Sequence, residues 1–303
     1  MNLDAMSVPR ASIPLVGGVL IGSEALAKGV VTRNDLRYHC QRIFPDIYVR
    51  GEATLRDRTI GAWLWSGRRA VIAGAAASAL HGAAYVNADI PIELIWRNGR
   101  PPHGLIVRNE TYADDEITRV AGLPVTTPAR TVFDLGRHLP RDEAVARIDA
   151  LAWTLQVRVD DVVPLIDRYP GARGSRALRI ALPLVDAGAD SPRETWLRLQ
   201  LTDAGMPPEQ TQITVIHDRR RIAIIDMGWE KYGVGVNYDG IFHQSDRRRY
   251  VQDQKTMRKL EALGWIVIRV IAEDDIVDVL TRVERALRSR GWHPSCTQGQ
   301  NAA

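Results

Sequence analysis

The sequence predicts an α/β protein, and three features of the chain support that fold class. Short runs of β-forming residues alternate with segments of helical periodicity along most of its length. The last predicted strand, 265–270, follows a helix, which is the pattern of a parallel crossover. A hydrophobic share of 45% and a charged share of 25% are those of ordinary globular proteins, so a chain of 303 residues can build more than one core.

The first sixty residues predict a short helix, a second helix and a strand hairpin. Gly29 closes the helix "GSEALAKG", and Thr32 is placed to cap the helix "RNDLRYHC". Pro45 and Asp46 supply the turn of the hairpin "RIFPDIYVR". We treat 1–60 as one N-terminal segment.

Residues 61–185 predict a second α/β region. A helix of small residues is expected over 70–84, followed by the strands "IPIELIW" and "GLIVRNE". In "LPVTTPARTVFDLGR", Thr127 is the expected cap and Pro128 the first helical residue. Two more helices follow, "RDEAVARIDALAW" and "VDDVVPLIDRY". A Gly/Asp/Ser-Pro break near 186–192 predicts the main domain boundary.

The C-terminal region, 190–290, predicts a mixed sheet flanked by helices. Its order is a helix (193–204), three strands joined by short turns, a helix (246–263), a strand (265–270) and a helix (274–289). The short turns predict an antiparallel meander, which the last strand joins in parallel. The polar tail, 291–303, is expected to be disordered.

Charge and cysteine content predict a cytoplasmic protein. The net charge of +4 is compatible with nucleic acid as a partner without requiring one. Cys40 and Cys296 offer neither a metal motif nor a disulfide framework, which suits a reducing compartment. The apolar stretch 13–22 is short and lacks a preceding basic cluster, and no apolar run reaches membrane-spanning length. We expect neither a membrane partner nor an organic cofactor.

Polar residues gather at one end of two neighbouring predicted strands. Alternation places Asn237 and Asp239 on one face of "GVGVNYDG", opposite Val234 and Val236. If this strand forms a hairpin with "RIAIIDMGW", Asp226 lies beside that pair. Carboxylate oxygens are the ligands that Mg²⁺ prefers, and a bound Mg²⁺ can activate water and neutralise a scissile phosphate.

Three further residues are candidates for the same site. Glu194 begins the preceding helix, and His243, just past the turn, is suited to transfer a proton or to contact phosphate. Asp253 is an acid inside an apolar helical stripe, where an unpaired carboxylate is costly.

Structural alternatives remain open for these acids. Ser191 and Glu194 have the spacing of a capping box. Asp226 and Asp239 stand where turn aspartates are common, and Asp253 is placed to pair with an arginine. The convergence of several acids on one strand end is therefore the feature that favours a site.

Two arginine runs are either solvated faces or phosphate contacts. They are Arg219, Arg220 and Arg221 in the first run, and Arg247, Arg248 and Arg249 in the second.

The segments "SPRETWLRLQLTDAGMPPEQTQITV", "IAIIDMGW" and "VGVNYDGIFHQSDRRRYVQDQKTMRKLEALGWIVIRV" resemble the DUF559 group, which is allied to the very-short-patch-repair endonucleases within the PD-(D/E)XK superfamily. The resemblance covers about 190–285. It implies a restriction-endonuclease-like fold and Mg²⁺-dependent hydrolysis of DNA phosphodiesters.

The resemblance also implies the metal ligands. Asp226 matches the first-strand aspartate, and Asn237 and Asp239 occupy the two ends of the acidic-x-basic element. The group usually carries an acid where this chain has Asn237, so the expected affinity for Mg²⁺ is reduced.

The remaining catalytic positions follow in the same way. Glu194 matches the helix glutamate, and His243 matches the downstream histidine. Asp253 matches the helix acid and has a supporting role.

The segments "SEALAKGVVTRNDLRYHCQRIFPDIYVRG", "AGAAASALHGA" and "GLPVTTPARTVFDLGR" resemble the AbiEi family, the antitoxins of type IV toxin–antitoxin systems. The resemblance covers about 20–170 and implies a winged helix-turn-helix before a second α/β domain. It also implies binding to operator DNA and a cognate toxin as a protein partner.

The N-terminal segment leaves room for only one short helix before the hairpin, so we expect a degenerate winged helix. A helix-turn-helix reads bases with a full recognition helix in the major groove. Arg33 and Arg37 are the expected phosphate contacts. Packing or partner binding is the alternative role of this segment.

Two functions therefore remain open. One is a DNA-associated endonuclease whose C-terminal domain cleaves with Mg²⁺. The other is a non-catalytic antitoxin-type regulator whose nuclease-like domain only binds nucleic acid or protein.

Overall fold

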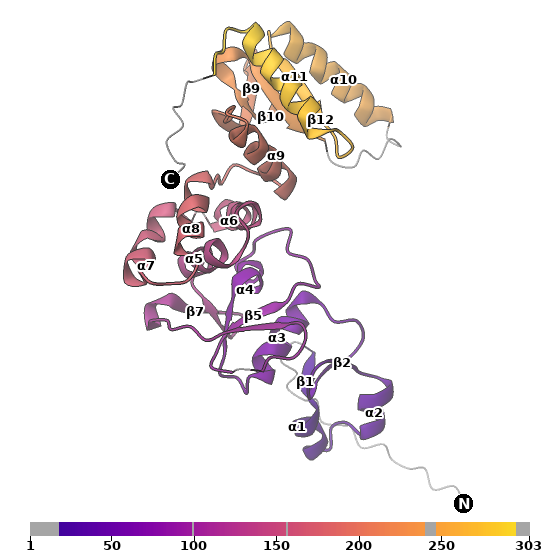
Figure 1. Ribbon diagram of the computed structural model, residues 1–303. Helices are drawn as coiled ribbons and strands as arrows, with labels where there is room; N and C mark the ends of the chain where they lie inside the picture. The colour runs from indigo at the N-terminus through magenta and orange to yellow at the C-terminus, as the bar shows by residue number, and fades with distance from the viewer. Residues whose placement is uncertain (1–17, 99, 156, 240–246, 295–303) are drawn as a thin grey trace, which may run out of the picture. The chain divides into compact units, whose positions relative to one another are not determined.

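The computed structural model describes residues 18–98, 100–155, 157–239 and 247–294, with the backbone alone for 247–250 (Figure 1). The chain divides into two compact units: residues 1–138 with 157–175, and residues 139–156 with 176–303. Helices and mixed sheets occur in the described parts, which confirms the predicted α/β class. No helix in these described ranges is long and apolar enough to cross a membrane.

The first unit begins with a three-stranded antiparallel sheet of order β1-β3-β2 and two short helices. Thr32 caps the second helix as predicted: its hydroxyl accepts from the Asp35 N–H at 3.1 Å, and the Asp35 carboxylate accepts from the Thr32 N–H at 2.7 Å. Pro45 and Asp46 form the predicted turn between the paired residues Phe44 and Ile47. The elements are β1 (Val19–Ile21), α1 (Gly22–Ala27), α2 (Arg33–Tyr38), β2 (Gln41–Phe44) and β3 (Ile47–Val49).

A five-stranded mixed sheet of order β6-β5-β4-β8-β7 completes the first unit. Its apolar core includes Ile72, Ile92, Leu94 and Val125, all completely buried. The elements are α3 (Leu55–Trp65), β4 (Val71–Ala73), α4 (Gly74–Leu80), β5 (Ile92–Ile95), β6 (Leu105–Arg108), η1 (Asp114–Glu116), β7 (Ile117–Val120), β8 (Leu123–Thr126), α5 (Pro128–His138), η2 (Val159–Asp161) and α7 (Val163–Arg168).

The prediction of one helix over 70–84 was wrong at its start. Residues Val71–Ala73 form β4, which pairs antiparallel with β5 and parallel with β8, so the neighbouring strands outweigh the local helix preference. Gly74 makes the change from strand to helix with φ +58°. A Cβ there would lie 2.3 Å from the Glu93 carboxylate, so the junction requires glycine.

Three helices of the second unit pack together around a small apolar cluster. They are α6 (Arg141–Leu155), α8 (Ser175–Ala181) and α9 (Pro192–Asp203), with η3 (Leu182–Leu184) following α8. Buried Asp149 on α6 accepts from Arg198 and Thr195 of α9, each at 2.8 Å. These bonds join α6 to α9, which lie on opposite sides of the domain boundary predicted near 186–192.

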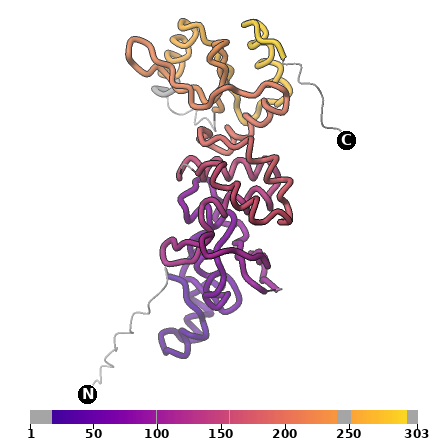
Figure 2. Tube along the Cα trace, turned by 90° about the vertical axis from the view of Figure 1, so that its left-hand side faces the viewer, coloured from indigo at the N-terminus to yellow at the C-terminus, as the bar shows by residue number. Residues whose placement is uncertain are grey.

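The C-terminal part of the second unit is a four-stranded sheet of order β12-β11-β10-β9. The pairings β9–β10 and β10–β11 are antiparallel and β11–β12 is parallel, as predicted. The β9–β10 hairpin continues beyond the last residue of β11 (Figure 2). The elements are β9 (Gln210–His217), β10 (Arg220–Trp229), η4 (Glu230–Tyr232), β11 (Val234–Tyr238), α10 (Arg247–Ala262), β12 (Ile266–Val270) and α11 (Ile276–Ser289). The part of the predicted tail from 295 onward lies outside the described residues.

Candidate functional site

Asp226 on β10 and Asn237 on β11 lie beside each other, as strand alternation predicts. The last backbone pair of these strands in this direction is Met227 with Val236. Beyond it, Asn237 Oδ1 accepts from the Asp226 N–H at 3.0 Å, and Asp226 Oδ2 accepts from the Tyr238 N–H at 2.6 Å. Two side chains therefore continue the hydrogen bonding where the strands separate.

The negative charge of the Asp226 carboxylate is poorly stabilised by its surroundings. Its pKa is raised to about 7, mainly by burial and also by the negative charges of Glu194 and Asp239. The hydrogen bond from the Tyr238 N–H acts in the opposite direction. Three of the predicted acids are therefore close enough to interact electrostatically.

Glu194 helps to hold the start of α9, where the Ser191 side chain accepts from the Glu194 N–H at 3.2 Å; this is one half of the capping box that was the structural alternative. Its Oε1 accepts from the Ser191 hydroxyl at 2.9 Å, and its Oε2 accepts from the Asp190 N–H at 3.1 Å. Gln212 on β9 donates to the same Oε2 at 3.1 Å. Burial raises the pKa of Glu194. Both oxygens are engaged in holding the helix start.

Asp239 pairs with an arginine that sequence reasoning did not select. Arg269 on β12 donates from Nε to Asp239 Oδ2. The Asp239 N–H donates to the Val270 carbonyl at 2.8 Å, so backbone and side chain both tie this residue to β12. The side chains of Arg269 and Asp239 are 28% and 22% exposed.

These residues do not fit a bound metal in the described arrangement. The Asn237 oxygen is used by a backbone N–H, both Glu194 oxygens are used by the helix cap, and Asp239 is paired with a guanidinium. Across the described ranges, no group of three or more histidine, cysteine, aspartate or glutamate side chains is arranged to hold a metal ion. The predicted Mg²⁺ site therefore stays a prediction.

The other predicted members of this site make no described contact with it or lie outside the described residues. Asp253 on α10 makes no hydrogen bond or ion pair with another described residue. His243 lies outside the described residues. The side chains of Arg247, Arg248 and Arg249, in the first turn of α10, are not described either.

The first arginine run lies exposed at the turn of the β9–β10 hairpin, with the backbone of Asp218 and Arg219 left-handed. Arg220 lines a surface hollow of about 610 Å³ that also contains His217 and Lys259. Asp218 is its acidic lining residue. Among the described residues, Arg220 and Lys259 form no ion pair, so the hollow is predominantly basic.

Arg33 and Arg37 are exposed on α2, a helix of six residues without a buried side chain. The guanidinium of Arg37 lies 5.4 Å from the ring centre of Tyr38, which is 67% exposed. Both predicted contacts are therefore available to a partner.

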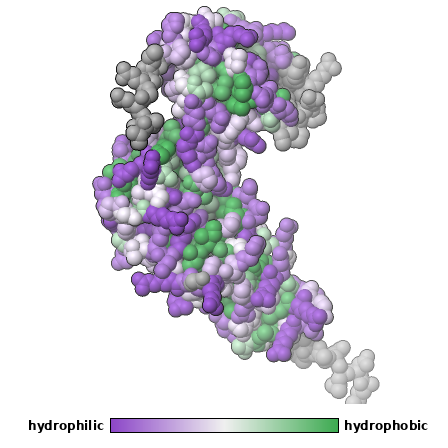
Figure 3. All heavy atoms as spheres, in the orientation of Figure 1, coloured by the Kyte–Doolittle hydropathy of each residue, from purple (hydrophilic) through white to green (hydrophobic). Residues whose placement is uncertain are grey.

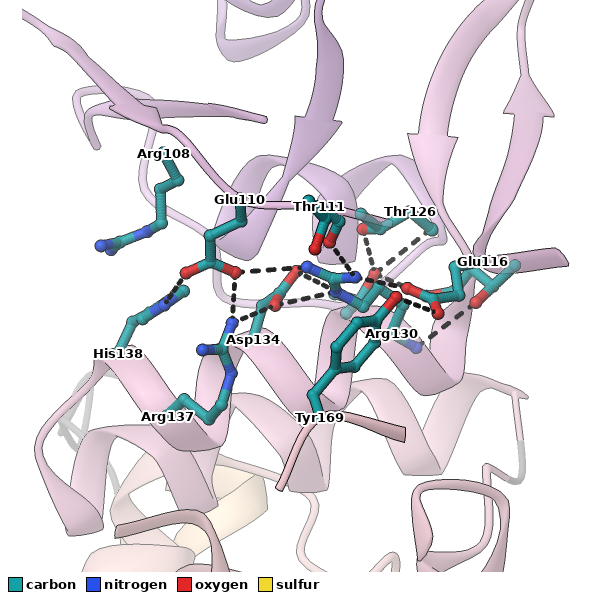
Figure 4. A network of polar contacts seen from close by, with 12 residues as sticks. Arg108, Glu110, Thr111, Glu116, Thr126, Arg130, Asp134, Arg137, His138 and Tyr169 are labelled. Carbon is teal, nitrogen blue, oxygen red and sulfur yellow. Dashed lines mark hydrogen bonds and ion pairs between the residues drawn. The ribbon is translucent and has the colours of Figure 1, made fainter. Parts of the chain in front are cut away.

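A buried ionic network in the first unit was missed by sequence reasoning (Figure 4). Arg130, 1% exposed, donates to Asp134 at 3.0 Å, to Glu110 at 3.2 Å and to Glu116. Arg137 also pairs with Asp134 at 3.0 Å and with Glu110. The network joins α5 to the residues around β6 and β7.

The edge of this network reaches α7. Arg168 donates to Glu116 at 2.6 Å, and the Tyr169 hydroxyl donates to the same oxygen at 2.7 Å. Burial favours the neutral form of Glu110, but hydrogen bonds from His138 and Arg137 lower its pKa to about 2.

Two sequence signals point to these missed residues. Arg130 and Asp134 are four residues apart on a helix whose other side chains are largely apolar, which indicates a buried pair. Arg269 interrupts the β-forming run "WIVIRV" at a position that alternates with Ile268 and Val270. The first signal names Asp134 but not Glu110 or Glu116, and the second names no partner, because these other partners lie elsewhere in the chain.

Comparison with known proteins gives distant relatives. An uncharacterized protein of Mycobacterium tuberculosis, strain CDC 1551 / Oshkosh, is 26% identical over 235 residues, which cover 77% of this chain and 86% of the relative. An uncharacterized protein of strain ATCC 25618 / H37Rv shows the same identity and coverage. No solved structure matches significantly. Residues 69–184 of this chain match the family model of the AbiEi antitoxin C-terminal domain.

Proposed function

We propose that this protein binds DNA as a non-catalytic, antitoxin-type transcriptional regulator. The observation that carries the proposal is the match of residues 69–184 to an antitoxin domain, directly behind a small unit of order β1-α1-α2-β2-β3. That order resembles a reduced winged helix-turn-helix, in which α2 takes the place of the recognition helix.

The surface of α2 supports contact with DNA. Arg33 and Arg37 are exposed, and hydrophilic side chains cover this helix in Figure 3. Guanidinium groups bind phosphate oxygens through several N–H donors at once. With six residues, α2 is roughly 9 Å long, which suits phosphate contacts better than reading several bases.

The basic hollow of the second unit supports a further contact with the phosphate backbone. Arg220 and Lys259, which line the hollow, come from the β9–β10 hairpin and from α10, and Arg219 and Arg221 are the sequence neighbours of Arg220. Clustered charges of one sign in a concave surface raise the local concentration of an oppositely charged ligand.

The antitoxin-domain match also supports a cognate toxin as a protein partner. We expect the partner to be encoded beside this chain. Co-expression of the two proteins followed by purification through one of them tests this. The proposal predicts a complex or relief of growth inhibition, and the absence of both would contradict it.

Metal-dependent DNA hydrolysis is the second candidate. It is favoured by the electrostatic coupling of Glu194, Asp226 and Asp239 at one end of a mixed sheet. Asn237 and the Arg269–Asp239 pair weigh against it, because each removes an anionic ligand. Plasmid cleavage with Mg²⁺ or Mn²⁺ separates the two candidates. The regulator predicts none, whereas cleavage that Asp226→Ala and Asp239→Ala abolish would establish the nuclease.

The DNA-binding proposal is tested by fluorescence anisotropy with duplex DNA from upstream of the gene. Arg33→Ala with Arg37→Ala should weaken binding. The matched control is Arg119→Ala, because Arg119 is an exposed arginine on β7 in the same unit. Equal affinities of all three proteins would contradict the assignment of α2 as a DNA contact.

A further inference from the structure

Arg269 lies on β12, and Asp239 directly follows the last residue of β11, the parallel neighbour of β12. Arg269 stands opposite Asn237 in the β11–β12 register. The Arg269 carbonyl accepts from Arg282 Nη1 at 3.3 Å, which ties this end of β12 to α11. Asp239 is held by its own N–H on Val270 at 2.8 Å. The sheet therefore fixes the backbones of both residues in positions where the guanidinium of Arg269 meets the carboxylate of Asp239.

Asp226 lies near this pair on the neighbouring strand, because its Oδ2 accepts from the N–H of Tyr238, the residue before Asp239, at 2.6 Å. Asn237 contributes an amide oxygen and no charge where an acid would stand in the DUF559 pattern. One acid fewer and one arginine more lower the negative charge that a divalent ion would meet.

We infer that Arg269, through its ion pair with Asp239, is the permanent counter-cation at the cluster of Glu194, Asp226 and Asp239 and takes the place of a divalent metal ion. A metal ion at Asp239 must either displace the guanidinium or bind beside it against like-charge repulsion. Displacement leaves a half-buried arginine without its carboxylate. The carboxylates at this end of the sheet therefore already have a cation in Arg269 and leave no vacancy for the metal.

The inference explains two features together. An asparagine at 237 is sufficient because Arg269 needs fewer anionic partners than a divalent ion does. The Asn237 side chain is instead used to accept the Asp226 N–H. The inference does not rest on DNA binding, and it predicts that Mg²⁺ leaves the properties of the second unit unchanged.

Manganese titration of the full-length protein tests the inference directly, by calorimetry and by the electron paramagnetic resonance signal of free Mn²⁺. The wild type should show no saturable site up to millimolar Mn²⁺. Arg269→Gln should acquire one saturable site within this concentration range, because Asp239 is then free to bind the ion. Adding Asp239→Asn should remove it again.

Arg288→Gln is the matched control, because Arg288 pairs with Glu284 on α11 and not with the cluster. It should titrate like the wild type. A folded Arg269→Gln protein with unchanged Mn²⁺ binding overturns the inference. So does a saturable wild-type site that Asp226→Ala removes, and this second result decides the question even if Arg269→Gln does not fold.

Discussion

Asp226 and Asn237 hold two strands together where the backbone ladder ends. The Asn237 oxygen accepts from the Asp226 N–H at 3.0 Å, and the Asp226 carboxylate accepts from the N–H of Tyr238, the residue after Asn237, at 2.6 Å. This reciprocal arrangement gives both residues a structural role. It also holds a carboxylate whose pKa is raised to about 7, mainly by burial and also by the charge of Glu194.

The titration of Asp226 should make the second unit more stable at mildly acidic pH. Its folded pKa of about 7 lies above the ordinary value of 3.8, so the native state binds the extra proton between these values. Stability from this group is therefore lost as pH rises from about 4 to about 7, by at most about 4 kcal/mol and by less because the side chain is partly exposed.

Urea unfolding of the wild type and Asp226→Asn at pH 5 and pH 8 measures this effect. Asparagine keeps an oxygen for the Tyr238 N–H and cannot ionise. The variant should therefore gain stability relative to the wild type at pH 8 and lose that advantage at pH 5. A difference that is the same at both values would contradict the assignment.

Arg130 should be the most sensitive ionic residue of the first unit. Arg130→Met leaves Glu116 and Asp134, which are almost fully buried, without this partner. Breaking a buried pair by removing one member costs about 3–5 kcal/mol. The matched control Arg68→Met removes an exposed pair with Glu24 and should cost less than about 1 kcal/mol. Equal losses in unfolding free energy would show that burial does not matter here.

Glu110 should contribute stability with the opposite pH dependence from Asp226. Its pKa is lowered to about 2, so its contribution is present above its ordinary pKa of 4.5 and is lost as pH falls from there towards 2. Glu110→Gln should be less stable than the wild type at pH 7, by on the order of 2 kcal/mol after allowance for partial exposure. Acid unfolding followed by circular dichroism should show the two curves converging near pH 2. Curves that stay parallel down to that pH would exclude a titrating Glu110.

Placing an acid at position 237 should not create a nuclease. Asn237→Glu adds a negative charge next to Asp226, but Arg269 still pairs with Asp239. We therefore expect no plasmid cleavage in Mg²⁺ or Mn²⁺. Cleavage gained by this single change would mean that the site lacks only one ligand, and Asp239→Ala in the same background should then abolish it.

Local signals in the sequence were sufficient for much of the fold. Thr32 is followed three residues later by Asp35, and short turns join the strands of the C-terminal meander, so these elements and the neighbourhood of Asp226 and Asn237 were predictable. The strand Val71–Ala73 was not, because three residues become a strand only through pairing with β5 and β8.

The site was less predictable because its partners are distant in sequence. Arg269 meets Asp239 through the parallel pairing of β12, 30 residues further along the chain. Arg168 reaches Glu116 from 52 residues away. Residue spacing within one element carries no information about such contacts.

The salt dependence of DNA binding by the wild-type protein tests the central claim most directly. For a non-catalytic regulator that holds DNA through phosphate contacts, the logarithm of the affinity should fall linearly with the logarithm of salt concentration, and the DNA should stay intact in Mg²⁺. Arg33→Ala and Arg37→Ala should each reduce the slope by about 1. Absence of binding at low salt, or binding accompanied by Mg²⁺-dependent cleavage, would contradict the account.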